Sequence, residues 1–350
     1  MSDATAPGGD ALDLDALSAY VARVVPSVGR VHAIEKFQGG QSNPTFRLET
    51  DGGPVVLRAK PPGALLKSAH QVAREHRVMS ALRSSDVPVP EMLHLSGEGE
   101  ASPIGRQFFL MRFVEGVIHW DPSLDALDPD GRRAVTDSMN RTLAALHHVD
   151  PEAVGLADFG RPGNYFARQL SRWTQQYRAS ETDPIEDMDR VIRWLEAALP
   201  ADDGSVSLVH GDYRLDNMMF DATSHEVVAV LDWELSTLGH PVADLAYQCM
   251  QWRLPSDSAF KGLGGLDRAG LGLPVESDYV AQYCERTGRD AIPNWNYYLA
   301  FNFFRLGAIL QGVYKRALAG NASNPERGRR MGQAVPLLAA AALDTIETQP

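Results

Sequence analysis

The chain has 350 residues, of which 44% are hydrophobic and 22% charged, so it is long enough for one large domain or for two lobes with separate cores. A net charge of −12 argues against nonspecific nucleic-acid binding, which needs a basic surface. The two cysteines are too few for a disulfide framework or a cysteine zinc site, and no apolar run reaches transmembrane length. Because the acidic start MSDATAPGGDALDLD is unlike a signal peptide, we expect a globular cytoplasmic protein with no membrane partner.

The first third of the chain predicts a small β-rich lobe, after a polar leader and a helix at 14–25. Apolar and polar residues alternate between 31 and 59 around the hairpin turn Asp51-Gly52-Gly53, which is typical of antiparallel strands. An amphipathic helix follows at 68–82 and ends before two prolines, and 106–116 reads as another apolar strand. We therefore expect a leader and helix at 1–28 and a small lobe at 29–112.

Helical periodicity dominates from residue 130 onward, and one pair of short apolar strands interrupts it between 206 and 232. The glycine-rich segment 260–274 lacks the spacing of a phosphate-binding P-loop, and we expect a flexible loop there on the substrate side. The predicted class is α+β, with two lobes, of which the larger and mostly helical one spans 113–350.

The strand pair at 206–232 carries charged residues inside apolar sequence. LVHGDYRLDNMMFD (208–221) contains the pattern H-G-D-x-x-x-x-N, with Asp212 and Asn217, and Asp232 ends the next strand twenty positions after Asp212. Buried charges are costly unless they are paired. Phosphoryl transfer needs positioning, charge neutralisation and a base beside the attacking hydroxyl. Asp212 can be that base, and Asn217 and Asp232 offer the oxygen ligands that Mg²⁺ prefers.

Arg214 lies two residues after the candidate base and can reach the transferring phosphoryl group to offset its charge. Taken singly, these residues have ordinary explanations. Asp212 and Asn217 could form a turn with local side-chain hydrogen bonds, and we assign His210 to holding the loop rather than to chemistry. The set at this spacing favours catalysis.

HGDYRLDN followed by LDWE resembles the catalytic and metal-binding segments of the aminoglycoside phosphotransferase and choline kinase superfamily, small-molecule relatives of protein kinases. The resemblance implies a bilobal protein-kinase-like fold with ATP and Mg²⁺ as cofactors, Asp212 as the base and Asn217 and Asp232 as metal ligands. It also implies that Asp244, in GHPVADLA, braces the catalytic loop, although an acid at a helix N-terminus is favourable by itself.

On this interpretation the lobe at 29–112 binds the nucleotide. Such a site needs a basic side chain on a strand to contact the phosphates, and an acidic side chain on a helix to hold that basic group. Arg58 in VVLRAK and Glu75 in the following helix are the candidates. We favour Arg58 over Lys60, because Pro61-Pro62 ends the strand; the alternative for Arg58 and Glu75 is a weak surface ion pair.

Two further segments would complete the nucleotide site. The turn QGGQSNPTF (38–46) would cover the phosphates, although hairpins also use paired glycines. The backbone near Arg112 and Val114 would hydrogen-bond adenine. The residues of the turn that permit close approach or add donors are Gly39, Gly40, Ser42 and Asn43.

Longer segments, among them LADFGRPGNYFARQLSRW and YYLAFNFFRLGAILQGVYKRAL, resemble kinase-like proteins that occur alone in bacteria or fused to acyl-CoA dehydrogenases. This resemblance implies phosphorylation of a hydroxyacyl-CoA, for example at the 4-hydroxy position. The distribution of charged residues agrees with this substrate. Residues 160–180 include four arginines and no acid, and residues 305–330 include six basic residues and one acid. Such segments suit an anionic ligand, although arginines on solvated helix faces are a common alternative.

Two other functions stay open at this point. Phosphorylation of an aminoglycoside or amino alcohol would need an acidic acceptor pocket, and the two basic segments argue against it. A noncatalytic nucleotide- or CoA-binding module would usually lack the base or a metal ligand, whereas Asp212, Asn217 and Asp232 are all present.

Overall fold

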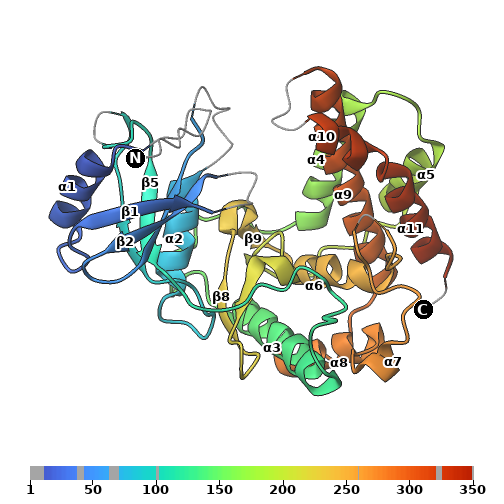
Figure 1. Ribbon diagram of the computed structural model, residues 1–350. Coiled ribbons are helices and arrows are strands. Elements are labelled where there is room, and N and C mark those ends of the chain that lie inside the picture. Colours follow the sequence, from blue (N-terminus) through green and yellow to red (C-terminus); the bar gives the residue numbers. More distant parts are fainter. Residues whose placement is uncertain are drawn as a thin grey trace. The chain divides into compact units, whose positions relative to one another are not determined.

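The computed structural model describes residues 12–37, 43–62, 71–99, 102–258, 260–320 and 325–348. The chain divides into two compact units, of which the first comprises Met1–Val117 with Val228–Ser236 and the second Ile118–Val227 with Thr237–Pro350. In the described residues, the first unit holds an antiparallel sheet and two α-helices, and the second is mostly helical (Figure 1). The expected α+β class, with a small β-rich part and a larger helical part, is confirmed.

The sheet of the first unit has five strands in the order β1-β2-β3-β5-β4, and each strand is antiparallel to its neighbours. The hairpin between β2 and β3 turns at residues 51–53, as predicted, with the N–H of Gly53 donating to the Thr50 carbonyl at 3.2 Å. The strands are β1 (Val31–Lys36), β2 (Thr45–Thr50), β3 (Val55–Ala59), β4 (Met92–Leu95) and β5 (Phe108–Arg112).

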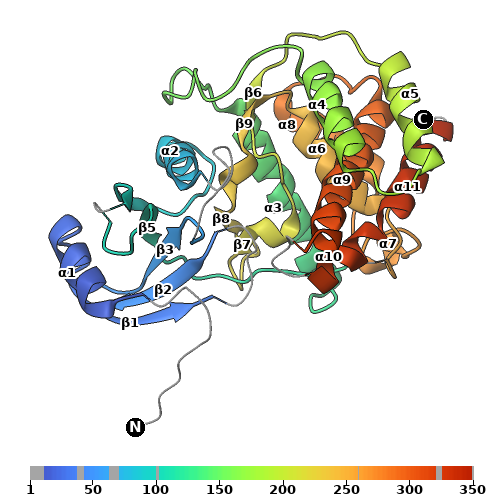
Figure 2. The same cartoon turned by 90° about the horizontal axis from the view of Figure 1, so that it is seen from above.

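Two helices cover opposite faces of this sheet (Figures 1 and 2). Alternate strand residues, such as Leu57 and Leu110, form one core with Leu17 and Val21 of α1 (Leu14–Val24). The intervening residue Phe109 faces α2 (Val72–Leu82), where its ring lies 6.2 Å from that of His76. The central strands β3 and β5 are therefore buried on both faces, and β3 carries its one polar residue, Arg58, on the α2 side.

The second unit is built around the 24-residue helix α9, which packs against α4, α5, α6, α10 and α11. Figure 2 shows this bundle from above. Its helices in the described residues are α3 (Pro129–His148), α4 (Tyr165–Ser180), α5 (Glu186–Ala197), α6 (Val242–Cys249), α7 (Arg268–Leu271), α8 (Glu276–Thr287), α9 (Trp295–Leu318), α10 (Pro325–Gly332) and α11 (Val335–Glu347). Within the part of the chain that the structure describes, every helix is too short or too polar to cross a lipid bilayer.

Short strands position the catalytic segment. β6 (Ser207–Val209) pairs antiparallel with β9 (Thr237–Gly239), and Leu208 lies opposite Leu238. β7 (Met218–Phe220) is followed by a tight turn at 221–226 and then by β8 (Val227–Val230). The loop between β6 and β7 therefore starts and ends in buried strands, which fixes residues 210–217 between them.

Candidate active site

The loop between β6 and β7 carries the H-G-D-x-x-x-x-N pattern. Gly211 has φ +84°, a conformation that favours glycine, so the chain turns sharply just before Asp212. His210 is completely buried, and its Nδ1 accepts the backbone N–H of Asp212 at 3.2 Å. The imidazole thus holds the loop, which is the role expected for it, and the carboxylate of Asp212 stays partly exposed.

Asp244, near the start of α6, fixes the beginning of this loop. Its carboxylate accepts the backbone N–H groups of His210 at 2.6 Å and Gly211 at 2.8 Å, and the residue is only 1% exposed. Burial alone would raise the pKa of Asp244, but His147, 3.5 Å away, and the Gly211 N–H outweigh burial and lower it. An ionised, buried carboxylate therefore braces the loop backbone.

In the described part of the chain, two side chains donate to the carboxylate of Asp212. Tyr247 from α6 donates its hydroxyl hydrogen to Oδ1 at 2.6 Å, and the Asn217 amide donates to Oδ2 at 2.9 Å. The same Asn217 nitrogen lies 2.9 Å from the backbone carbonyl of Asp212. These bonds point the amide nitrogen of Asn217 at Asp212 and leave its oxygen as the atom that can bind a cation.

Arg214 stays beside the candidate base. Its guanidinium forms an ion pair with Asp216, and its Nε lies 4.0 Å from Oδ2 of Asp212. Burial by itself would lower the pKa of Arg214, but the neighbouring Tyr247, Asp212 and Asp216 raise it by more. The net effect is a raised pKa, so the side chain stays positively charged. Its side chain is 43% exposed, which leaves the charge within reach of an anionic ligand.

In the first unit, Arg58 of β3 contacts two acids from distant parts of the sequence. Its Nε lies 2.8 Å from Oε2 of Glu75, without the alignment of a hydrogen bond, and its Nη2 lies 2.7 Å from Oδ1 of Asp232. The Arg58 side chain is 13% exposed and that of Glu75 is 1% exposed, so this is a buried pair rather than the weak surface pair that was the alternative. Lys60 lies beyond the end of β3 and contacts Glu98 instead.

Asp232 has an unusual backbone conformation, with φ +62° and ψ +62°, immediately before a single 3-10 turn. Left-handed backbone at a non-glycine residue is uncommon and clusters at functional sites. Oxygen atoms of Glu75, Asp232 and Glu234 lie within 4.8 Å of one another. These hard oxygen donors, all in the first unit, are of the kind that binds Mg²⁺. The assignment of Asn217 and Asp232 as metal ligands stays a prediction.

The other residues expected to bind nucleotide are only partly described. Gly39, Gly40 and Ser42 lie outside the described residues. Asn43 is 2% exposed, and its amide donates to Oε1 of Glu75 at 2.7 Å, so it helps to hold the acid that pairs with Arg58. Further along, the backbone N–H of Arg112 donates to the Glu91 carbonyl at 2.9 Å at the end of β5. Val114 follows two residues later, where the chain has left the sheet.

Two residues close to Asp212 were not expected from the sequence. Tyr247 lies one helical turn after Asp244, so both reach the catalytic loop from α6. Arg305 lies in the apolar run of α9 and is 7% exposed, and its Nη2 donates to the Gly211 carbonyl at 2.7 Å. A single charge in an apolar helix was the available signal, but Arg305 counted in the sequence only as one of several basic residues.

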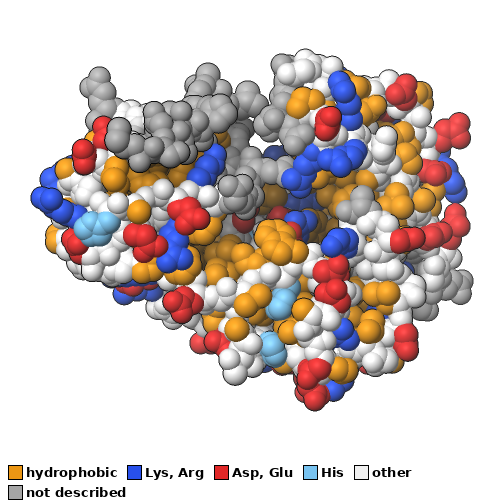
Figure 3. Space-filling view, viewed as in Figure 1, with side chains coloured by type: hydrophobic (Ala, Val, Ile, Leu, Met, Phe, Trp, Pro, Cys, Tyr) orange, Lys and Arg blue, Asp and Glu red, His pale blue; other side chains and the backbone are white. Residues whose placement is uncertain are grey.

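Lys and Arg side chains gather over α4, α9 and α10 of the second unit (Figure 3). Arg172 of α4 is exposed, and its guanidinium lies 5.3 Å from the centre of the Trp173 ring. The guanidinium of Arg305 lies 5.8 Å from the same ring. Exposed basic residues of these helices, called the basic surface below, include Arg172, Lys315, Arg316, Arg327, Arg329 and Arg330.

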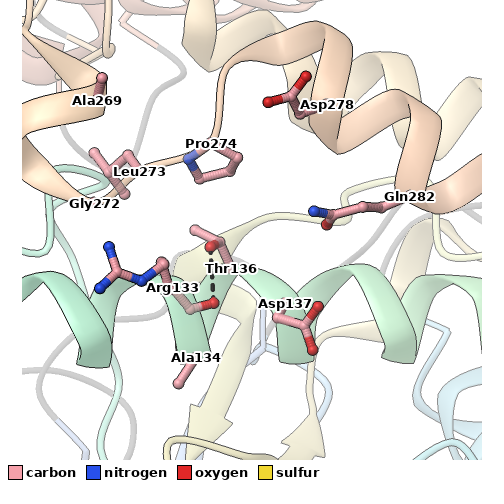
Figure 4. Close-up of a pocket in the computed structure, with 10 residues that line it drawn as sticks. All are labelled: Arg133, Ala134, Thr136, Asp137, Ala269, Gly272, Leu273, Pro274, Asp278 and Gln282. Carbon is pink, nitrogen blue, oxygen red and sulfur yellow. Dashed lines mark hydrogen bonds between the residues drawn. The ribbon is translucent and has the colours of Figure 1, made fainter.

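A separate pocket of about 580 Å³ lies between α3 and the segment from α7 to α8 (Figure 4). Its lining is mixed, with Arg133 and Asp137 on α3 facing Asp278 and Gln282 on α8. The glycine-rich segment expected to lie on the substrate side contributes Gly272 and its neighbours to this wall. The residues that contact Asp212 do not line this pocket, and we assign it no part in the chemistry.

Comparison with known proteins assigns most of the chain to one family. Residues 33–274, a stretch that includes Arg58, Asp212 and Asp232, match the phosphotransferase enzyme family APH. The chain is 46% identical over 317 residues to mouse acyl-CoA dehydrogenase family member 10 and 40% identical over 342 residues to the probable acyl-CoA dehydrogenase IBR3 of Arabidopsis thaliana. These matches cover 90% and 91% of this chain but 29% and 41% of the relatives, so the chain spans less than half of their length.

Among solved structures, a putative aminoglycoside phosphotransferase from Ralstonia eutropha is 45% identical with a TM-score of 0.87, covering 97% of this chain and 100% of that one. APH(4)-Ia, solved with ADP and hygromycin B, has a TM-score of 0.64 at 14% identity, covering 95% and 100% of the two chains, and so shares the fold. The kinase-like fold is thereby confirmed. Since the family match covers most of the chain, the protein belongs to the APH phosphotransferase family, that is, to the small-molecule kinases.

Proposed function

We propose that this protein transfers the γ-phosphoryl group of ATP, in the presence of Mg²⁺, to a hydroxyl of a hydroxyacyl-CoA, for example a 4-hydroxyacyl-CoA. The observation that carries the proposal is the carboxylate of Asp212. It is partly exposed, bonded to Tyr247 and Asn217, and placed on a loop whose backbone Asp244 holds. A base fixed in this way can accept a proton from a hydroxyl without reorganising.

In the proposed reaction the acceptor hydroxyl gives its proton to Asp212 while its oxygen forms a bond to the γ-phosphorus. The bond from that phosphorus to the β-phosphate oxygen breaks, and ADP leaves. Arg214 offsets the negative charge of the transferring group, and Mg²⁺ held by Asn217 and Asp232 would neutralise charge on the phosphates. Arg58, held by Glu75, contacts the phosphates.

The remaining nucleotide contacts follow the same proposal. The backbone near Arg112 and Val114 hydrogen-bonds adenine, and Asn43 holds the Glu75 carboxylate that pairs with Arg58. Structures of fold neighbours hold ADP or AMP-PNP, which supports an adenine nucleotide as the donor.

Two observations support an acyl-CoA as the acceptor. First, the basic surface over α4, α9 and α10 suits the phosphate groups of CoA and is unsuited to a cationic aminoglycoside. Second, the curated relatives are named as acyl-CoA dehydrogenases. A phosphate on the acceptor would turn a hydroxyl that is hard to eliminate into a good leaving group.

The test is an acceptor panel with ATP and Mg²⁺, with phosphorylated products identified by mass spectrometry. The panel contains 3-, 4- and 5-hydroxyacyl-CoAs of one chain length, the acyl-CoA without a hydroxyl as the matched control, and an aminoglycoside and choline. We expect a product 80 Da heavier from a hydroxyacyl-CoA and none from the unsubstituted acyl-CoA. Phosphorylation of the aminoglycoside or choline alone would overturn the proposed acceptor.

A further inference from the structure

The contact between Tyr247 and Asp212 joins residues 35 positions apart and is the shorter of the two side-chain hydrogen bonds to the Asp212 carboxylate. Tyr247 lies on α6 between Ala246 and Gln248, which are both buried. Burial, and after it the charge of Asp212, raise the pKa of Tyr247. Its hydroxyl therefore keeps its proton and acts towards Asp212 as a donor.

Arg305 contacts both Tyr247 and the residue before Asp212. Its Nη2 donates to the carbonyl of Gly211, the residue before the candidate base, at 2.7 Å. Its guanidinium also lies 5.5 Å from the centre of the Tyr247 ring, in the range of a cation–π interaction. Because α9 packs against α6, the base and its donor are fixed by two core helices rather than by the loop alone.

We propose that Tyr247 is a positioning residue, which holds the Asp212 carboxylate in the orientation that accepts the proton of the acceptor hydroxyl, and that Arg305 holds Tyr247 in place. With Oδ1 bonded to Tyr247 and Oδ2 to Asn217, rotation of the carboxylate breaks at least one hydrogen bond. Tyr247 keeps its own proton throughout, because the hydroxyl proton moves to Asp212. Small errors in the position of a base cost large factors in rate.

The inference rests on the proposed role of Asp212, and a double-mutant cycle tests the link between the two residues. Single-turnover transfer to the acceptor is measured at saturating ATP in the wild type, Tyr247→Phe, Asp212→Asn and the double variant. We expect Tyr247→Phe to lower the rate about tenfold or more in the wild-type background and less than about twofold in the Asp212→Asn background. The KM for ATP stays the same.

The control is Tyr297→Phe. Tyr297 is 2% exposed, and among the described residues its hydroxyl has no hydrogen-bond partner. This variant removes the same atom from a buried tyrosine of the same unit, and we expect the wild-type rate. An equal fold loss for Tyr247→Phe in both backgrounds, or no loss in the wild-type background, would overturn the positioning role.

A second measurement needs no acceptor, so it separates this inference from the proposed function. Crystal structures of the wild type and of Tyr247→Phe are compared at the Asp212 side chain. We expect Asp212 to leave its orientation in the variant while Gly211 stays bonded to Arg305. If the wild type phosphorylates no hydroxyacyl-CoA, the proposed acceptor fails and this comparison still decides the role of Tyr247. An unchanged Asp212 carboxylate in the variant would contradict it.

Discussion

The carboxylate of Asp244 accepts the backbone N–H of His210 at 2.6 Å, although the two residues are 34 positions apart. The bond ties the first helix after β9 to the first residue of the catalytic loop. It is completely buried, and the acid that accepts it is ionised at neutral pH because its pKa is lowered. The orientation of the loop therefore depends on a charge that is itself buried.

Replacing this charge should damage catalysis and stability together. In Asp244→Asn one carboxylate oxygen becomes an NH₂ group that faces a backbone N–H, which leaves buried donors without an acceptor. We expect the free energy of unfolding to fall by about 3 kcal/mol, measured in urea, and kcat to fall more than about tenfold. The control is Asp221→Asn, since Asp221 accepts the N–H groups of Thr223 and Ser224 in an exposed turn. A smaller loss at Asp244 than at Asp221 would contradict the role of the brace.

The buried pair formed by Arg58 and Glu75 predicts that replacing Arg58 has a larger effect on stability and ATP binding than replacing Lys60. Burial raises the pKa of Glu75 to about 7, and Arg58 opposes this rise. In Arg58→Ala the acid loses its cation inside the protein, so we expect a loss of about 3 kcal/mol in the free energy of unfolding and weaker ATP binding by calorimetry. Lys60→Ala, which removes a contact with an exposed acid, should change neither. Equal effects of the two variants on ATP affinity would remove the distinction between Arg58 and Lys60.

His147 predicts how stability depends on pH. Burial lowers the pKa of His147 below its ordinary value of 6.5, although Asp244 opposes the shift. Between the lowered pKa and 6.5 the unfolded chain binds more protons than the folded protein, so stability falls as the pH drops through this window. We expect the free energy of unfolding to decrease less steeply from pH 7 to pH 5 in His147→Gln than in the wild type. The raised pKa of Glu75 changes stability with pH in the opposite direction, but Glu75 is present in both proteins, so its contribution cancels in the comparison. Identical slopes of unfolding free energy against pH in the two proteins would contradict the prediction.

Arg172 tests whether the basic surface binds the acceptor. Its side chain is exposed on α4 beside Trp173. For Arg172→Glu we expect the KM for a hydroxyacyl-CoA to rise about threefold to tenfold, with the KM for ATP unchanged and the effect weaker at high salt. The control is Arg23→Glu, the same charge reversal on an exposed arginine of α1 in the first unit. A KM for the acyl-CoA that changes equally in the two variants would show a general effect of net charge.

Much of this arrangement follows from local sequence. Hydrophobic periodicity predicts the long helices, and the short spacing from Asp212 to Asn217 places base and amide on one loop, which ends in a 3-10 turn at Leu215–Asn217. The strand β9 was not expected, because three residues ending in glycine carry no alternating pattern and β9 is formed by pairing with β6. By contrast β8, the preceding strand along the chain, is a run of valine and alanine, and it is the strand that Asp232 was expected to end.

The contacts that surround the base could not be predicted in the same way. Tyr247 meets Asp212 across 35 residues, and Arg305 meets Gly211 across 94. Each lies in a helix whose periodicity is explained by burial alone, so nothing in the local pattern marks its partner. The Asn43 amide that holds Glu75 is a similar case, since its position in a glycine-containing turn indicated a contact with the phosphates instead.

The most direct test of the central claim is phosphoryl transfer by Asp212→Asn. Transfer from labelled ATP to the acceptor is measured in a single turnover, and ATP affinity is measured by calorimetry on the same preparation. We predict that transfer falls by about 10² to 10⁴ while ATP affinity stays within about twofold, because Asp212 removes the acceptor proton and does not bind the nucleotide. Transfer at a rate close to that of the wild type would contradict the assignment of Asp212 as the base.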